Sequence, residues 1–398
     1  MSARPGRVWP SRTETDVLVR SLKTVHVTTI DLTAWCFLRT WFQTLRKEGH
    51  EVVLVTTPGP FSPRLREEGV RVVDIPIHRR ISLLWDFVSV VRLALFFLRY
   101  RPDVVHTHTS KAGFVGRFAA WLTRVPLVLH TMHEPPHNAA SGWMRRIYIG
   151  FERLASLWAH HVITVSYANE KEILARRLVP EEKLTVIREG LDLSRYPRLE
   201  DRREAIRRLG IADALPVVGM VGRLEAAKGH TYLLKAAQLL QARHPGVRIV
   251  IVGGGQLRSA LEAEASALQV TGCVTFTGFR DDMLSLMQGF DIFTLPSLWE
   301  GLGIVLLEAM AYERPVVASR VGGVQDVVVP GETGLLVPAR SPEALADAIG
   351  ALLLDPARAA EMGRAGYQRL VRDFRDDVAN ERMLTLYREQ VEARRIPT

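Results

Sequence analysis

Cysteine is scarce in this chain, with only Cys36 and Cys273 among 398 residues. Two cysteines exclude a disulfide framework and a zinc site made of cysteines alone, and free thiols are typical of a reducing compartment. A long uncharged apolar run is also missing, because Asp86 and Arg92 interrupt the most apolar stretch, residues 81–100. The sequence therefore predicts a cytoplasmic protein without a membrane-spanning helix.

Several patterns that would indicate other functions are absent as well. Residues 1–22 lack the apolar segment of a signal peptide, and we expect a flexible extension there. No Asp-x-Asp motif indicates a metal, and residues 253–255 lack the spacing of the dinucleotide fingerprint. The aromatic residues do not alternate with basic ones as base-stacking surfaces require, so nucleic-acid binding is not expected. Five histidines gather in one window, where we favour hydrogen-bonded or ligand-lining roles over zinc: His106, His108, His130, His133 and His137.

The positive charge is unevenly distributed. Residues 1–200 contain 29 Lys and Arg against 19 Asp and Glu, whereas residues 201–398 contain 23 against 24. A basic half attracts phosphate-bearing partners or an anionic membrane, although an arginine-biased soluble surface explains the excess equally well. Together with the apolar stretch 81–100, this charge suits a lipid-linked or phosphorylated acceptor. A peripheral position at the inner face of the cell membrane therefore stays open.

Short apolar runs typical of strands alternate with helix-like segments along the whole chain. Residues 24–28 and 51–56 enclose the helix-like stretch 34–48, for example, and the pattern restarts at 217–220. This alternation predicts an α/β fold with parallel sheets, and ligands at the carboxyl ends of the strands. The expected parts are an extension at 1–22, a first domain at 23–196, a second domain at 197–375 and a C-terminal helix at 376–398 that could pack back on the first domain.

The segment 293–319, FTLPSLWEGLGIVLLEAMAYERPVVAS, contains the most specific pattern. Glu300 follows a predicted strand in a glycine-rich loop, and Glu308 lies on the helix expected to begin near Gly303. The N-terminus of a helix offers N–H groups and a positive dipole end to a phosphate, and glycines let an anion approach the backbone. Glu300 would then bind sugar hydroxyls, and Glu308 could reach a ribose diol. The alternative is a capped helix with two solvated carboxylates.

A second pattern, GMVGRLEAAKGH at 219–230, places Arg223 and Lys228 directly after a predicted strand. Two cations in this position can neutralise a diphosphate, and a guanidinium can bind it through two parallel hydrogen bonds. The alternative is a pair of surface cations without a ligand.

Together, the Arg-x4-Lys and Glu-x7-Glu pairs, with the intervening VGGG and VTFTGF segments, resemble the retaining nucleotide-sugar glycosyltransferases of family 4. The resemblance covers most of the chain and is strongest over residues 217–338. The first half, with HVTTIDL and the segment 102–134, is similar to the acceptor domain of bacterial polysaccharide glycosyltransferases. The resemblance implies the GT-B fold, in which two Rossmann-like α/β domains face each other across a deep cleft.

The resemblance also implies roles for individual residues. Arg223 and Lys228 match the family's cations on the donor diphosphate, and His133 matches its histidine near the anomeric centre. Glu300 matches the carboxylate near the donor sugar, and Glu308 the carboxylate on the ribose. The loop amides on the sugar and β-phosphate match Gly301, Leu302, Gly303 and Ile304, and the nucleobase contact matches Phe279 and Arg280.

Three segments depart from the family pattern. Residues 28–31 are Thr-Thr-Ile-Asp where a Gly-Gly loop is usual, and Glu134 follows His133 where glycine is usual. The interdomain Asn-Gly-x-Asp motif is Glu-Gly-Leu-Asp at 189–192. These changes concern the acceptor contacts and the hinge.

The expected activity is that of a hexosyltransferase. A hexosyl or N-acetylhexosaminyl group would move, with retention, from a nucleoside-diphosphate sugar, expected to be UDP-linked, to an acceptor hydroxyl. No cofactor or essential metal is expected, because Arg223, Lys228 and a helix N-terminus would stabilise the departing diphosphate. The acceptor would be a glycan, a lipid-linked molecule or a small molecule in polysaccharide or lipid-linked glycan synthesis. The alternatives are a nucleotide-sugar epimerase of the same fold and a catalytically silent nucleotide-sugar-binding protein; nucleic-acid binding rests on charge alone.

Overall fold

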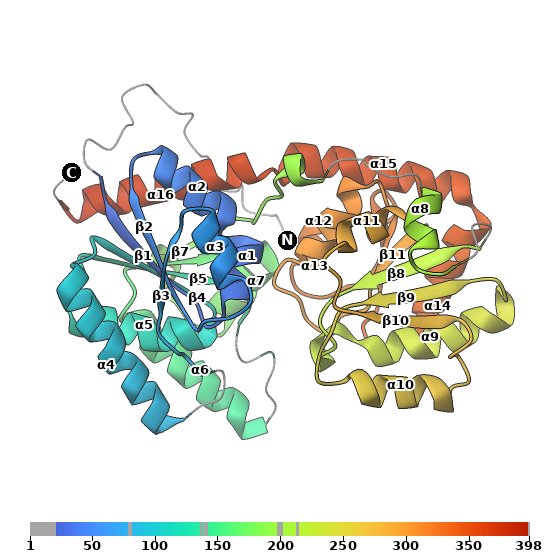
Figure 1. Ribbon diagram of the computed structural model, residues 1–398, viewed down its shortest axis with the longest axis horizontal. Helices are drawn as coiled ribbons and strands as arrows, with labels where there is room; N and C mark the ends of the chain where they lie inside the picture. Colours follow the sequence, from blue (N-terminus) through green and yellow to red (C-terminus); the bar gives the residue numbers. More distant parts are fainter. Residues whose placement is uncertain are drawn as a thin grey trace. The chain divides into compact units, whose positions relative to one another are not determined.

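The chain divides into two compact units (Figure 1). The computed structural model describes residues 21–78, 82–135, 138, 142–196, 202–211 and 215–396. Unit 1 consists of the chain up to Arg188 together with the segment from Asp376 onward, and unit 2 is Glu189–Arg375. The C-terminal helix thus belongs to unit 1, while most of the expected extension at 1–22 lies outside the described residues.

The boundary between the units differs from the expected position at 196/197. Leu191 donates its N–H to the carbonyl of Phe374 at 2.8 Å and forms a parallel bridge with Arg375. These backbone bonds tie the segment after Arg188 to unit 2, so the division falls at residue 188. Pro197, at the expected boundary, lies outside the described residues.

Unit 1 is built on a seven-stranded sheet with the strand order β3-β2-β1-β4-β5-β6-β7. All neighbouring strands are parallel, as the alternation of strands and helices predicts. The short edge strand β7 was not expected. The strands are β1 (Lys23–Val27), β2 (Glu51–Thr56), β3 (Arg71–Asp74), β4 (Val104–His108), β5 (Leu127–Met132), β6 (His161–Thr164) and β7 (Leu184–Val186).

Helices cover both faces of this sheet, because successive strand residues point to opposite faces. Val53 and Val55 of β2 pack toward α4 and α5, whereas Val52 and Leu54 pack toward α2 and α16. One face carries α4 (Leu83–Tyr100), α5 (Ser110–Leu122), α6 (Gly142–Leu157) and α7 (Tyr167–Ala175). The other carries α1 (Asp31–Phe37), α2 (Arg39–Lys47), α3 (Ser62–Glu67) and α16 (Asp376–Ala393) (Figure 1).

The single helix expected at 34–48 was wrong. The chain forms α1 and α2, which meet at Leu38, where the N–H of Leu38 closes the last turn of α1 on the carbonyl of Ala34. Neither proline nor glycine occurs at this break, so the local sequence gives no signal for it.

Unit 2 contains a six-stranded parallel sheet with the order β10-β9-β8-β11-β12-β13. Its strands are β8 (Val217–Val221), β9 (Arg248–Val252), β10 (Val274–Gly278), β11 (Ile292–Leu295), β12 (Val316–Ser319) and β13 (Gly334–Val337). Its helices are α8 (Arg202–Arg207), α9 (His230–Arg243), α10 (Arg258–Ala267), α11 (Met283–Gln288), α12 (Ile304–Ala311), α13 (Val324–Val327), α14 (Pro342–Leu354) and α15 (Pro356–Asp373). Among the described residues, no helix combines the length and apolar character that crossing a bilayer requires.

In each sheet the strand order reverses direction once. The reversal lies between β1 and β4 in unit 1 and between β8 and β11 in unit 2. At such a point the loops from the two neighbouring strands diverge, which leaves room for a ligand at the carboxyl edge of the sheet. The fold therefore marks one candidate binding edge in each unit.

The helix α16 is part of the core of unit 1. Tyr387 is fully buried, packs against the Trp41 ring at 5.1 Å between ring centroids, and forms a 2.8 Å hydrogen bond with His106 Nδ1.

The substitution Tyr387→Ala should lower the free energy of unfolding by about 3 kcal/mol, because it removes a buried ring. Urea unfolding followed by tryptophan fluorescence measures this in unit 1, since seven of the eight tryptophans precede residue 189. Tyr387→Phe keeps the ring and should cost only about 1 kcal/mol; an unchanged midpoint for Tyr387→Ala would contradict this role of α16.

Candidate functional site

The residues expected to bind the donor diphosphate and sugar meet where the strand order of unit 2 reverses. Arg223 and Lys228 follow β8, and Glu300 follows β11, the neighbouring strand. Lys228 Nζ lies 2.5 Å from Glu300 Oε1, although 72 residues separate the two positions. The parallel strands bring these side chains together because β8 and β11 end at the same edge of the sheet.

Backbone hydrogen bonds hold the loops at this edge to one another. In the loop after β8, Leu224 donates its N–H to the carbonyl of Gly254, in the loop after β9, at 2.9 Å. The carbonyl of Ala227 in the same loop accepts from the N–H of Leu298, in the loop after β11, at 2.7 Å. The loop after β12 is joined through Gly323 N, which donates to Glu300 O at 3.1 Å. Four loops thus form one continuous rim, and the positions of its side chains depend on all of them.

Two glycines make this close contact between loops possible. A Cβ atom on Gly229 would lie 2.0 Å from the carbonyl oxygen of Pro296, and one on Gly322 would lie 2.1 Å from that of Glu300. Both residues also have positive φ angles, of 68° and 41°. Any side chain at these positions would push the loops after β8 and β12 away from the loop that contains Glu300.

Glu300 is nearly buried and is held by two partners. Its Oε1 accepts hydrogen bonds from Lys228 Nζ at 2.5 Å and from Ser297 Oγ at 2.7 Å. The side chain of Glu300 is 9% exposed and that of Lys228 is 21% exposed, so each charge needs the other. The sequence assigned these two residues to different parts of the donor and did not predict their pairing or the role of Ser297.

Two predicted arginines lie nearer the surface. Arg223 is half-exposed and pairs with Glu225 Oε1 at 2.8 Å. Arg280, expected near the nucleobase, forms two 2.7 Å hydrogen bonds with Asp282, and this pairing lowers the pKa of the Asp282 carboxyl. Phe279 beside it is exposed. Such exposed pairs are weak and can exchange one anionic partner for another.

The helix α12 presents its N-terminus at the same edge. Its N-cap residue is Gly303, in the left-handed region with φ of 85°, and no side chain of the described residues caps it. The first turn, beginning at Ile304, therefore offers backbone N–H groups and the positive end of the helix dipole to an anion. Gly301 and Leu302 complete the predicted loop in front of this turn.

Glu308 lies one turn further along α12, where Tyr196 donates its hydroxyl to Glu308 Oε1 at 2.9 Å. Burial raises the pKa of the Glu308 carboxyl, although the hydrogen bond from Tyr196 and the nearby Arg195 charge partly oppose this shift. Tyr196 comes from the segment that enters unit 2, 112 residues earlier. Sequence spacing gave no signal for this contact.

In unit 1, His133 follows β5 at the carboxyl edge of the sheet. Its ring lies 5.7 Å from the ring of His108 and 5.3 Å from that of Phe37, and its carbonyl accepts from Asn169 Nδ2. Asp31 lies in the segment 28–31, where the family usually has a Gly-Gly loop. Its side chain is buried, and Oδ2 accepts hydrogen bonds from the backbone N–H groups of Phe61 and Ser62 at the start of α3, each at 2.8 Å. Asp31 thus anchors the neighbouring loop rather than facing a ligand.

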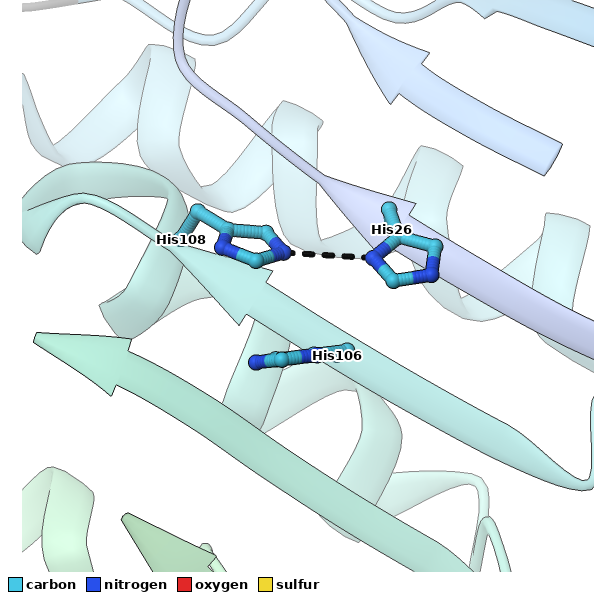
Figure 2. Close-up of side chains that lie close together, drawn as sticks. All are labelled: His26, His106 and His108. Atoms are coloured by element: carbon cyan, nitrogen blue, oxygen red, sulfur yellow. Dashed lines mark hydrogen bonds between the residues drawn. The ribbon is translucent and has the colours of Figure 1, made fainter. Parts of the chain in front are cut away.

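Three buried histidines form a cluster between β1 and β4 (Figure 2). His26 Nδ1 and His108 Nε2 are hydrogen-bonded at 3.2 Å, and His106 lies beside them. Burial lowers the pKa of His26 to about 3 and holds those of His106 and His108 well below the usual value, so the rings are neutral. Neutral imidazoles can bind a metal, but His106 already uses both nitrogens, with Tyr387 at 2.8 Å and Thr131 at 2.7 Å. The contacts fit a hydrogen-bonded core network; His137 lies outside the described residues.

Two doubly wound α/β units in one chain are the architecture of the GT-B glycosyltransferases. The family described as glycosyl transferases group 1 matches residues 201–369, and the glycosyl transferase 4-like domain matches residues 36–190. This chain belongs to the family 4 glycosyltransferases of the GT-B fold and is an enzyme of that class.

The related proteins include glycosyltransferases of two bacteria. The chain is 26% identical to the capsular polysaccharide biosynthesis glycosyltransferase CapM of Staphylococcus aureus, over 93% of this chain and 97% of that protein. It is 32% identical to the UDP-Gal:alpha-D-GlcNAc-diphosphoundecaprenol alpha-1,3-galactosyltransferase of Escherichia coli, over 71% of this chain and 74% of that protein.

Solved structures share the fold over nearly the whole chain. Sucrose-phosphate synthase of Thermosynechococcus elongatus has a TM-score of 0.78 at 25% identity, covering 93% of this chain and all (100%) of that one. HepE of Anabaena, solved with UDP and glucose, has a TM-score of 0.81 at 22% identity, covering 92% and 100%. The expected fold class is therefore confirmed.

The raised pKa of Glu308 predicts a pH-dependent effect of Glu308→Gln. The folded state binds the carboxyl proton of Glu308 more tightly than the unfolded chain does. The free energy of unfolding therefore falls as pH rises from the pKa of this carboxyl in the unfolded chain to its higher pKa in the folded protein. Glu308→Gln should therefore melt at a higher temperature than the wild type at about pH 8, and the difference should vanish toward about pH 4. Thermal melts across this range measure it, and no gain at the higher pH would refute the burial argument.

Proposed function

We propose that this glycosyltransferase moves a hexosyl or N-acetylhexosaminyl group from a nucleoside-diphosphate sugar, with UDP the expected carrier, to an acceptor hydroxyl with retention of configuration. The observation that carries this proposal is the meeting of Lys228, Glu300 and the N-terminus of α12 at the strand reversal of unit 2. A cation, a carboxylate and an open helix end at one edge suit a ligand with both phosphate and hydroxyl groups.

Lys228 is suited to hold a phosphate and Glu300 at the same time. An ammonium group has three N–H donors, and the pair with Glu300 Oε1 uses one of them. A diphosphate beside α12 would add a second partner to Lys228 without breaking the first. Arg223 would bind the same diphosphate by exchanging its exposed contact with Glu225 for a phosphate group. A phosphate can accept two parallel hydrogen bonds from the guanidinium, which makes it the stronger partner.

The two glutamates would bind hydroxyl groups of the donor. Glu300 accepts from Ser297 and Lys228 through one oxygen, Oε1, so that Oε2 is the atom proposed to accept from the transferred sugar. Glu308, deeper along α12 and joined to Tyr196, is the proposed ribose ligand. Gly301, Leu302, Gly303 and Ile304 would supply the backbone amides between them, with Arg280 near the base.

We propose that the leaving diphosphate is stabilised without a divalent metal. Negative charge develops on the phosphate oxygens as the bond to the anomeric carbon breaks, and Arg223, Lys228 and the α12 dipole would oppose that charge. The acceptor hydroxyl would attack the anomeric carbon on the face from which the diphosphate departs. An oxygen of the departing phosphate would take the proton of that hydroxyl. His133, at the ligand edge of unit 1, is the proposed contact to the donor sugar.

The acceptor is proposed to be a glycan or a lipid-linked molecule. One relative is named for capsular polysaccharide synthesis and another for a diphosphoundecaprenol-linked acceptor. Unit 1 supplies most of the positive charge of the chain, which suits an acceptor bearing phosphate.

The donor site can be tested by nucleotide binding in the presence of a chelator. UDP should raise the melting temperature more than GDP or ADP, and the shift should disappear in Arg223→Ala/Lys228→Ala because the diphosphate loses both cations. The matched control is Lys235→Ala/Arg243→Ala, which removes the same residue types from the exposed side of α9 in the same unit. Equal shifts in the wild type and the Arg223/Lys228 variant would refute the site.

Retention and metal independence have a separate test. With an α-linked UDP-sugar, the proton spectrum of the first product should show an α anomer, and the turnover rate should be unchanged by EDTA. A β-linked product, or a loss of turnover that magnesium restores, would overturn this part of the proposal. Isomerised sugar formed from donor alone would indicate an epimerase instead.

A further inference from the structure

The helix α4 exposes an apolar stripe along its whole length. Leu84, Phe87, Val91, Leu95 and Leu98 are three or four positions apart, so they lie on one side of the helix. Phe87 is 66% exposed and Leu95 is 62% exposed. The opposite side of α4 is buried in the core of unit 1, so the exposed stripe is not needed to attach the helix.

The helix α6 has a similar stripe. Trp143, Ile147, Phe151 and Leu154 follow the same spacing and are all exposed, with Trp143 at 70%. Both helices pack against α5, on the same face of the sheet (Figure 1). Exposed apolar side chains on α4 and α6 therefore belong to a single helical layer, and Trp121 at the end of α5 adds to it.

On this layer the acidic side chains are paired, and the exposed charged side chains are positive. The three helices contain two acidic residues, and both pair with the cations of α5: Asp86 with Lys111, and Glu152 with Arg117 at 2.8 Å. The latter pair is buried. The exposed charged side chains of the three helices are consequently all arginines: Arg92, Arg99, Arg146 and Arg153.

We propose that the layer formed by α4, α5 and α6 docks unit 1 onto an anionic lipid bilayer, with the two apolar stripes at the depth of the headgroups. Soluble proteins rarely expose apolar area of this extent without a partner. Aromatic and aliphatic side chains flanked by arginines are the combination that binds an anionic membrane interface, since apolar burial and charge attraction add. Arginine side chains extend past apolar neighbours to reach lipid phosphates.

This distribution of charge favours a bilayer over a second copy of this chain. An isologous interface would bring the same surface against itself, so the four exposed arginines of each copy would meet there without an exposed acidic side chain of these helices to pair with. Anionic headgroups neutralise each of these charges instead. The inference goes beyond the proposed sugar transfer and does not depend on it.

Flotation with lipid vesicles tests the surface in the full-length protein. Vesicles of phosphatidylcholine and phosphatidylglycerol should carry the protein, and vesicles of phosphatidylcholine alone should carry it much less. Leu95→Ser/Phe151→Ser should lower the partition coefficient by about tenfold or more, because each side chain loses its transfer from water. Arg92→Gln/Arg146→Gln should lower it by about fivefold per arginine and reduce its salt dependence.

The matched control is Leu354→Ser, compared with Leu95→Ser alone; Leu354, on α14 of unit 2, is 77% exposed and so at least as accessible as Leu95. Only Leu95→Ser should weaken vesicle binding. Equal losses in the two variants, or equal partition to neutral and anionic vesicles, would overturn the proposal.

Sedimentation velocity without lipid distinguishes the two alternatives to a bilayer, which are a second copy of this chain and another protein. A wild-type dimer that Leu95→Ser/Phe151→Ser converts to a monomer, together with no flotation, would assign the surface to a second copy. No dimer and no flotation would assign it to a protein partner, and either outcome overturns the bilayer. The nucleotide-induced melting shift, measured on the same variants, should be unchanged; its absence in the wild type would refute the donor site and leave the membrane result standing.

Discussion

The adjacency of β8 and β11 is the constraint on which the candidate site depends. Lys228 and Glu300 follow these strands and form a 2.5 Å ion pair at a largely buried position, where neither charge is stable without a partner. The loops can approach closely only because Gly229 and Gly322 leave room for the carbonyls of Pro296 and Glu300. Strand order, loop contact and charge pairing thus form one cooperative arrangement.

Glu308 shows that this arrangement is not optimised for stability alone. A carboxyl whose pKa is raised by burial destabilises the folded state at neutral pH, and a neutral side chain would fill the same space. The clustered histidines His26, His106 and His108 of unit 1 differ from Glu308, because burial lowers their pKa values and keeps the rings neutral, and hydrogen bonds engage most of their nitrogens. The ligand-binding role proposed for Glu308 would account for a carboxylate that costs stability at this position of α12.

Much of the fold could be predicted from the sequence, because buried parallel strands have continuous apolar runs. β2 occupies the predicted residues, and α12 begins at Ile304, next to the predicted Gly303. The break at Leu38 and the division at Arg188 could not be predicted. Leu38 lies in a continuous amphipathic segment, and the division depends on backbone bonds from Leu191 to Phe374, far away in the sequence.

The sequence by itself determined the family, the α/β class and the strand ends at which Arg223, Lys228 and Glu300 lie, since periodicity and motif spacing are local properties. Only the tertiary structure decided which of these groups touch. Tyr196 reaches Glu308 across 112 residues, and the acidic residues of α4 and α6 pair with α5. Such pairings follow from the order of the strands and the packing of helices between them, which spacing along the chain does not encode.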